Sequence, residues 1–163
     1  MSAILQEADL APTKPIADVN AVNQFVTFTC GNRAFGVDIM SVREIRSWSP
    51  TTPMPNQPFG ADGVLDIRGK IVEVYDLAAM LGATGSGLEA GRVILVVSLG
   101  DRDVGILADT VSDIIFAKPE DMRPSPSRDG GRTESCVSML VKNEDRLIAI
   151  LDLAVLFPNY SPR

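Results

Sequence analysis

The hydrophobic pattern along the chain begins with an alternating stretch at residue 25. Within Phe25–Cys30 the apolar Val26, Phe28 and Cys30 share one face, and Thr27 and Thr29 lie on the other. Aromatic and β-branched residues at a period of two are typical of a β-strand. Gly31-Asn32 then offers a turn, and a second run of the same kind follows at Ala34–Ile39. The sequence therefore predicts a β-hairpin at the start of the ordered chain.

A second hairpin is predicted over residues 63–76, with its turn at Arg68-Gly69-Lys70. Asp76 directly precedes the apolar run Leu77–Leu81, which ends at Gly82. Aspartate is a preferred N-cap and glycine a frequent helix stop, so a short helix is expected there.

The second half of the chain repeats these signals. Val93–Val97 is apolar throughout, which favours a strand buried on both faces. Arg146–Leu151 reads as another strand, and a short helix is expected over residues 152–157.

Four stretches show neither the strand period of two residues nor the helix period of 3.6 residues. Residues 1–22 form a partly polar leader, and we expect it to be flexible. Residues 49–58 carry four prolines, which excludes helix and central strand and predicts an exposed, extended connection. Residues 82–91, rich in glycine, should be a flexible connector, and Pro119–Gly131 another irregular stretch. Ser41–Ile45 fits either a helical turn or the start of a strand.

An internal duplication is the most informative feature. Gly31–Gly36 recurs at Gly100–Gly105, and Ile71–Leu81 parallels Leu147–Phe157. The chain therefore reads as two copies of a small β unit, each with about five short strands and a terminal helical turn. Short strands joined by Gly and Pro turns favour closed barrels. We predict one mainly β domain over residues 23–163, built from two packed barrels at about 23–85 and 91–160, with a ligand groove between them.

Composition narrows the function. The 163 residues carry a net charge of −6 and contain no histidine. The missing histidine excludes imidazole catalysis, Ser-His-Asp triads and histidine-ligated zinc. An acidic chain without a basic run is a poor partner for nucleic acid or anionic lipid. Cys30 and Cys136 are far apart in the sequence, and we expect both to be reduced. With no signal peptide and no apolar run of membrane-spanning length, we expect a cytoplasmic protein.

Few residues remain that could catalyse a reaction or anchor a partner. Asp66, Glu73 and Asp76 are the candidates for a carboxylate acid/base pair of a hydrolase. Asp76 recurs as Asp152 at the same place in the repeat, which favours a capping role over a catalytic one. Arg68 at the hairpin tip fits either a solvated turn residue or an anchor for a partner.

Several segments taken together resemble CheW-like domains. Gly63–Gly69 (Gly-Val-Leu-Asp-Ile-Arg-Gly) is similar to the family signature Gly-Val-Ile-Asn-Leu-Arg-Gly, and Val104–Asp113 to its second-half signature. The resemblance extends over about residues 23–158, through Phe25–Phe28, Phe35–Ile39, Val42–Ile45 and Leu147–Phe157. The chain departs from the family pattern at four positions: Asp66, Glu73, Ala108 and Ser138.

The resemblance implies two SH3-like five-stranded β-barrels with short helices, and a non-enzymatic adaptor that needs no cofactor or metal. Such an adaptor links the cytoplasmic tips of methyl-accepting chemoreceptors to the regulatory, CheW-like domain of the histidine kinase CheA. It would be cytoplasmic and recruited to receptor arrays. The kinase would contact the first barrel, and a receptor helix would lie in the groove between the barrels. The receptor-facing residues implied by position are Ile39, Val42, Glu44, Val64, Arg68 and Val104. An adaptor for pili, surface motility or second-messenger control is the alternative pathway.

Overall fold

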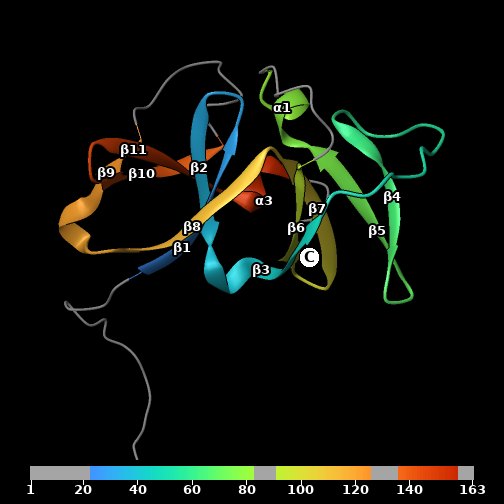
Figure 1. Cartoon of the computed structure of the whole chain (residues 1–163), viewed down its shortest axis with the longest axis horizontal. Helices are drawn as coiled ribbons and strands as arrows, with labels where there is room; N and C mark the ends of the chain where they lie inside the picture. Colours follow the sequence, from blue (N-terminus) through green and yellow to red (C-terminus); the bar gives the residue numbers. More distant parts are fainter. Residues whose placement is uncertain (1–22, 83–90, 126–135, 158–163) are drawn as a thin grey trace, which may run out of the picture.

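Two β-sheets lie side by side in the computed structural model, which describes residues 23–82, 91–125 and 136–157 (Figure 1). The predicted leader at 1–22 and most of the 82–91 connector fall outside these residues. The elements in chain order are β1 (Asn23–Cys30), β2 (Arg33–Asp38), η1 (Ile39–Ser41), β3 (Val42–Ser47), β4 (Ala61–Ile67), β5 (Lys70–Asp76), α1 (Leu77–Met80), β6 (Val93–Leu99), β7 (Arg102–Ala108), β8 (Thr110–Ala117), η2 (Pro119–Asp121), β9 (Met122–Pro124), β10 (Val137–Asn143), β11 (Arg146–Leu151) and α3 (Leu153–Leu156). The predicted class, mainly β with short helices, is confirmed.

Sheet A has six strands in the order β8-β1-β2-β11-β10-β9, and sheet B has five in the order β3-β6-β7-β5-β4. Neighbouring strands are antiparallel except for two parallel pairs, β2 with β11 and β5 with β7. Sheet B is therefore one continuous segment, residues 42–108. Sheet A combines residues 23–38 with residues 110–151.

This topology corrects the predicted division of the chain at about residues 85 and 91. The duplication itself is visible: β1 to β5 and α1 correspond to β6, β7, β8, β10, β11 and α3. Each copy is nevertheless split between the sheets, because its first hairpin pairs with strands of the other copy. The physical cause is η1, which carries the chain from β2 out of sheet A and into β3 of sheet B within three residues.

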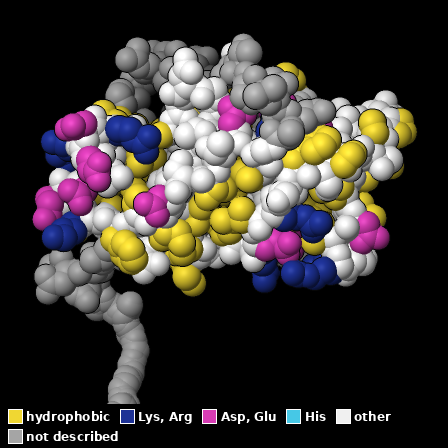
Figure 2. All heavy atoms as spheres, in the orientation of Figure 1, with side chains coloured by type: hydrophobic (Ala, Val, Ile, Leu, Met, Phe, Trp, Pro, Cys, Tyr) yellow, Lys and Arg dark blue, Asp and Glu magenta, His cyan; other side chains and the backbone are white. Residues whose placement is uncertain are grey.

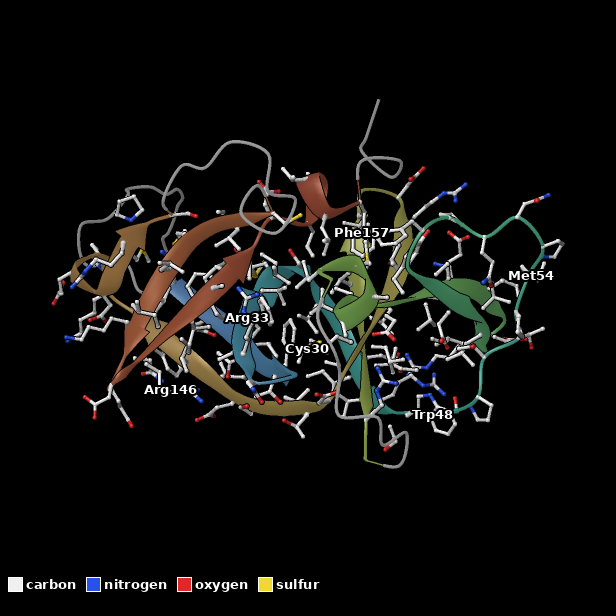
Figure 3. All side chains as sticks on the ribbon, turned by 90° about the horizontal axis from the view of Figure 1, so that it is seen from above. Cys30, Arg33, Trp48, Met54, Arg146 and Phe157 are labelled. Carbon is white, nitrogen blue, oxygen red and sulfur yellow. The ribbon has the colours of Figure 1, made fainter. Side chains whose placement is uncertain are left out.

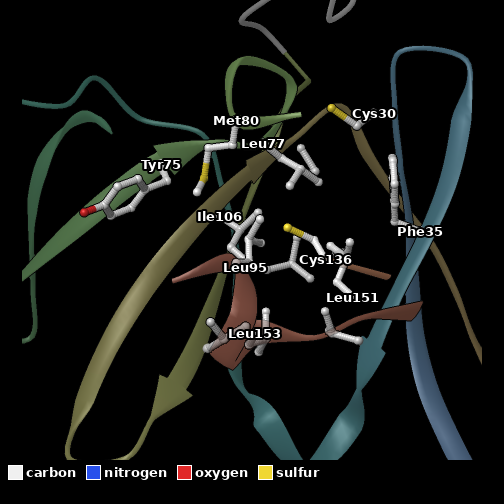
Figure 4. Packing of buried hydrophobic residues seen from close by; sticks show 14 of the residues in the cluster. Cys30, Phe35, Tyr75, Leu77, Met80, Leu95, Ile106, Cys136, Leu151 and Leu153 are labelled. Carbon is white, nitrogen blue, oxygen red and sulfur yellow. The ribbon is translucent and has the colours of Figure 1, made fainter. Parts of the chain in front are cut away.

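The exchange produces three apolar cores instead of two. One cluster lies on the inner side of sheet A around Phe25, Ile148 and Ile150. A second lies on the inner side of sheet B around Val74, Ile94 and Leu107. The largest cluster is shared between the sheets, and Figure 4 shows its side chains from both sheets and both helices facing one another. Its labelled members are Cys30, Phe35, Tyr75, Leu77, Met80, Leu95, Ile106, Cys136, Leu151 and Leu153.

Strand β6 shows why its sequence is apolar throughout. Ile94 and Val96 point into the core of sheet B, whereas Leu95 and Val97 point into the shared core. Both faces of the strand are therefore buried, as the sequence predicted.

The irregular segments are partly confirmed. Residues 49–58 contain one isolated bridge, Thr52 to Val64, and otherwise no regular structure. Residues 41–45 begin in η1 and continue into β3, so the predicted helical turn and the predicted strand start are each present in part. Pro119–Gly131, predicted to be irregular, forms η2 and the edge strand β9 in its described part, residues 119–125. Sheet A consequently has six strands where a five-stranded unit was expected.

Both predicted helix caps are present. Asp76 accepts a hydrogen bond from the backbone N–H of Ala78 at 3.1 Å. Asp152 accepts from the N–H groups of Ala154 and Val155 at 3.1 and 3.3 Å. These bonds satisfy donors that a helix leaves unpaired in its first turn. None of the helices in the described ranges is long and apolar enough to span a membrane.

We expect Asp152→Ala to lower the free energy of unfolding by about 1 kcal/mol, because it removes both capping bonds of α3. Equilibrium unfolding in urea measures this. Asp152→Asn keeps an acceptor oxygen and should cost much less. An equal loss in the two variants would contradict a capping role for Asp152.

Candidate functional site

A hollow of about 420 Å³ lies between the two sheets. Asp38 at the end of β2 and Ser41 at the end of η1 line it on one side. Much of the remaining wall comes from Ser98–Gly100, at the end of β6 and the start of the β6–β7 turn, and from Asp152–Ala154 at the start of α3. A concave site between packed units is where a ligand or peptide commonly binds.

Three of the residues expected to face a receptor lie in one row of paired residues that crosses sheet B, which we call the rung. Val42 pairs with Val97, Val97 with Val104, Val104 with Glu73, and Glu73 with Val64. Directly paired residues in a sheet point to the same face. Val42, Val64 and Val104 therefore share the face that turns toward the other sheet.

Their exposure differs, which changes the expected role of Val104. Val42 and Val64 at the two ends of the rung are half-buried, but Val104 in the middle has 0% of its surface exposed. Val104 belongs to the shared core and presents nothing to a partner. Whether Val104 contributes to receptor binding therefore stays a prediction, and from this position it could act only through the residues that cover it.

Ile39 is half-buried and packs against the shared core beside the hollow. Its neighbour Met40 is 87% exposed, and Asp38 fixes this turn by accepting a hydrogen bond from the Met40 N–H at 2.9 Å. Met40 was not among the predicted site residues, although an apolar residue between two predicted strands was a usable signal. In Figure 2 hydrophobic side chains form a band across the middle of this face, over β8 and the η1–β3 region, with charged side chains toward both ends.

Glu44 and Arg68 are brought together. Arg68 Nη1 lies 2.8 Å from Glu44 Oε1, and Arg46 Nη1 lies 3.6 Å from Glu44 Oε2. Glu44 is on edge strand β3, and Arg68 is in the β4–β5 turn at the opposite edge of sheet B. The ion pair therefore shows that the sheet curls far enough to bring its two edges within reach of one side-chain contact, as curvature toward a barrel requires.

The β4–β5 turn holds Arg68 outward. Arg68 and Gly69 both have positive φ, 55° and 84°, and Asp66 Oδ1 accepts a hydrogen bond from the Gly69 N–H at 2.8 Å. Two consecutive positive φ values are typical of the two-residue hairpin turn whose twist matches the strands. Asp66 is thus a turn residue, and its carboxylate is engaged with the backbone.

Arg68 is 80% exposed, so its ion pair is largely screened by water. We expect Arg68→Ala to change the free energy of unfolding by less than about 1 kcal/mol. Thermal unfolding of the two proteins at equal ionic strength checks this. A large loss of stability would mean that the pair holds the barrel closed, and Lys70→Ala at the same hairpin is the matched control.

The three carboxylates considered for hydrolysis do not form one site. Asp66 serves the turn, Asp76 caps α1, and Glu73 Oε1 accepts from the Tyr75 hydroxyl at 3.4 Å. Burial, followed by the charge of Glu73, raises the pKa of Tyr75 to about 12, so this phenol stays protonated. Within residues 23–82, 91–125 and 136–157 no group of three Cys, Asp or Glu side chains could hold a metal ion.

A second carboxylate cluster was not foreseen. Arg92 lies between Asp76 and Asp109, with N–O distances of 3.4 and 3.9 Å. Arg92 and Asp109 are mostly buried, and Asp109 Oδ2 accepts from the Gly31 N–H at 2.8 Å. Cys30 lies in the interior, as Figure 3 shows, within reach of the charges of Asp109, Asp76 and Arg92, and both cysteines are reduced.

Comparison with known proteins gives one consistent result. Residues 24–160 match the model of the CheW-like domain family. The chain is 35% identical over 140 residues to the chemotaxis protein CheW of Rhizobium meliloti (strain 1021), covering 86% of this chain and 90% of that protein. It is 27% identical over 118 residues to protein FrzA of Myxococcus xanthus, covering 72% and 74% of the two chains. The crystal structure of the scaffolding protein TtCheW from Thermoanaerobacter tengcongensis superposes with a TM-score of 0.77 at 26% identity, covering 84% of this chain and 93% of the other.

Proposed function

Because the chain belongs to the CheW-like domain family, in which the CheW proteins are adaptors and not enzymes, we propose that it couples methyl-accepting chemoreceptors to the histidine kinase CheA in cytoplasmic signalling arrays. The remaining question is which surface of this fold would bind each partner.

The observation that supports a receptor site is the position of η1 and β3 beside the hollow between the sheets. Ile39 and Val42 are half-buried there, Met40 is largely exposed, and Val64 lies at the far end of the same rung. An amphipathic helix binds such a surface by laying its apolar stripe along it. The receptor's cytoplasmic hairpin tip supplies a helix of this kind.

Glu44 and Arg68 would give this site its polar rim. Glu44 pairs with Val96 of the sheet B core, whereas Val42 pairs with Val97 of the shared core, so a bulge turns Glu44 to the other face of β3. The ion pair with Glu44 sets the direction in which the Arg68 guanidinium points. Charged rim groups contribute more to orientation and to the association rate than to affinity. We expect them to fix the register of the receptor helix.

The kinase would bind another part of sheet B, through its own CheW-like domain. Ile45 and Ile71 expose apolar side chains on this sheet. Their counterparts in the repeat, Ile114 and Leu147, expose apolar side chains on sheet A. Apolar residues at matching positions on two related sheets suit a partner of the same fold, since its surface has the same spacing.

A second candidate function keeps the adaptor role and changes the pathway, to the control of pili, surface motility or a second messenger. The observation in its favour is the similarity to protein FrzA, whose name does not refer to chemotaxis. In that case the receptors and the kinase would be those of the other pathway.

Co-sedimentation with receptor-containing membranes tests the proposal. The purified protein should sediment only when receptor is present, and CheA should then sediment in larger amounts than with receptor alone. Membranes without receptor are the control. Failure to bind chemotaxis receptors, under conditions in which a known adaptor binds them, would rule out the chemotaxis pathway and favour the second candidate.

A further inference from the structure

The chain passes from sheet B back to sheet A at a single residue, Asp109. Strand β7 of sheet B ends at Ala108, and strand β8 of sheet A begins at Thr110. Asp109 is only 8% exposed. A carboxylate with so little access to water must find partners inside the protein, because an unpaired buried charge costs several kcal/mol.

On one side Asp109 is bonded to sheet A. Its N–H donates to the carbonyl of Thr29 at 2.9 Å, and its Oδ2 accepts from the Gly31 N–H at 2.8 Å. Thr29 is the next-to-last residue of β1, and Gly31 starts the β1–β2 turn. These two bonds join the crossing to the first hairpin.

On the other side the same carboxylate faces sheet B. Its Oδ1 lies 3.9 Å from Nε of Arg92, and Arg92 Nη2 lies 3.4 Å from Asp76 Oδ1 at the end of β5. The Arg92 carbonyl also accepts from the Trp48 N–H, just beyond β3, at 3.0 Å. Arg92 thus ties Asp109 to two strands of sheet B.

The surroundings of this cluster are poorly solvated. Burial is the main cause that raises the pKa of the neighbouring Cys30 thiol to about 11, and the charges of Asp109 and Asp76 add to it. Ionic and hydrogen-bonding contacts are stronger where water is excluded.

We infer that Asp109 is a positioning residue that fixes the orientation of sheet A relative to sheet B, and with it the shape of the hollow between them. This inference rests on the proposed function, since it is the receptor helix that would sense the shape of the hollow. One buried carboxylate contacts both sheets at the point where the chain crosses between them.

The test is Asp109→Asn, which keeps an acceptor for the Gly31 N–H but removes the charge that faces Arg92. Spin labels at Ser47→Cys on β3 and Lys142→Cys on β10, both exposed, report the distance between the sheets by pulsed electron paramagnetic resonance. The native Cys30 and Cys136 are buried, so they should not take up label. We expect a broader distance distribution and a receptor affinity reduced about tenfold, within the usual range for coupling between sites.

Asp62→Asn is the matched control, because it also removes a carboxylate charge but its bond, to Thr51 at 2.7 Å, lies next to β4 within the sheet B segment. It should leave the distance distribution unchanged. If Asp109→Asn cannot be purified, Arg92→Lys, which keeps a cation with a different reach, is the second variant and should broaden the distribution in the same way.

The possible results distinguish the inference about Asp109 from the proposed receptor-coupling function. An unchanged distance distribution in the variant overturns the inference, and so does a broadened one with unaltered receptor affinity. A wild-type protein that does not bind receptor overturns the proposed function instead, and the distance distribution then decides by itself whether Asp109 orients the sheets.

Discussion

Val42→Asp should reduce receptor binding by about 100-fold or more, because it puts a carboxylate into the apolar part of the proposed helix site. Val42 is half-buried at the end of the rung that crosses sheet B. A bound helix would cover the new charge, and covering an unpaired carboxylate is costly. Losses of this size are typical of residues at the centre of an interface. Titration of receptor-containing membranes with the labelled protein measures the effect.

The repeat supplies a matched control for this variant. Val111 is the counterpart of Val42; it is also half-buried and packs against the same shared core, but it lies on sheet A. Val111→Asp should therefore cost similar stability while leaving receptor binding largely intact. Equal losses of binding in both variants would show that the shared core had been damaged, and the assignment of the site to Val42 would be wrong.

Gly105→Val should lower the free energy of unfolding by about 3 kcal/mol, the upper end of the usual cost of overpacking a core. Gly105 is on β7 opposite Val74, in the parallel pair β5–β7. A Cβ at this position would lie 3.0 Å from Ile94 Cγ2 and 3.2 Å from Val74 Cγ2. Both are methyl groups on β-branched side chains, which have few alternative rotamers. Equilibrium unfolding in guanidinium chloride measures the loss.

Gly36 is the corresponding residue in sheet A, opposite Ile150 in the parallel pair β2–β11. A Cβ there would lie 2.8 Å from Ile150 Cδ1, the mobile end of a longer side chain. Alanine should therefore be tolerated better at Gly36 than at Gly105, even though the clash is nominally closer. The reverse order would show that the backbone, and not the facing side chain, limits these positions.

Much of the fold was predictable because its signals are local. The hairpin turns at Gly31 and Gly69, the caps Asp76 and Asp152, and the doubly buried strand around Leu95 depend only on neighbouring residues. The duplication was also readable from the sequence, since equivalent strands bury equivalent positions.

The exchange of hairpins between the two copies could not be predicted in this way. A repeat shows that β1–β2 and β6–β7 are alike, but it does not show with which copy each hairpin pairs. The short η1, with no room for a return within sheet A, is what selects the exchanged arrangement.

The candidate site was predictable only in part for a related reason. Strand β7 is apolar on both faces, so alternation could not indicate that Val104 is fully buried while Val42 and Val64 are not. The ion pair between Glu44 and Arg68 also could not be predicted from the sequence, because it depends on the curl of sheet B. Whether these residues bind a receptor stays a prediction.

The continuity of sheet B has a consequence for synthesis on the ribosome. Residues 42–108 contain every strand of sheet B, so this unit can fold as soon as it has emerged. The β1–β2 hairpin is made first but must wait for β8 and β11, its partners on either side, which takes several seconds at ordinary elongation rates. During that time its two edges are unpaired and able to join a strand of another nascent chain. We therefore expect misassembly in cells to begin at the N-terminal hairpin, and slower translation of residues 42–108 to increase it.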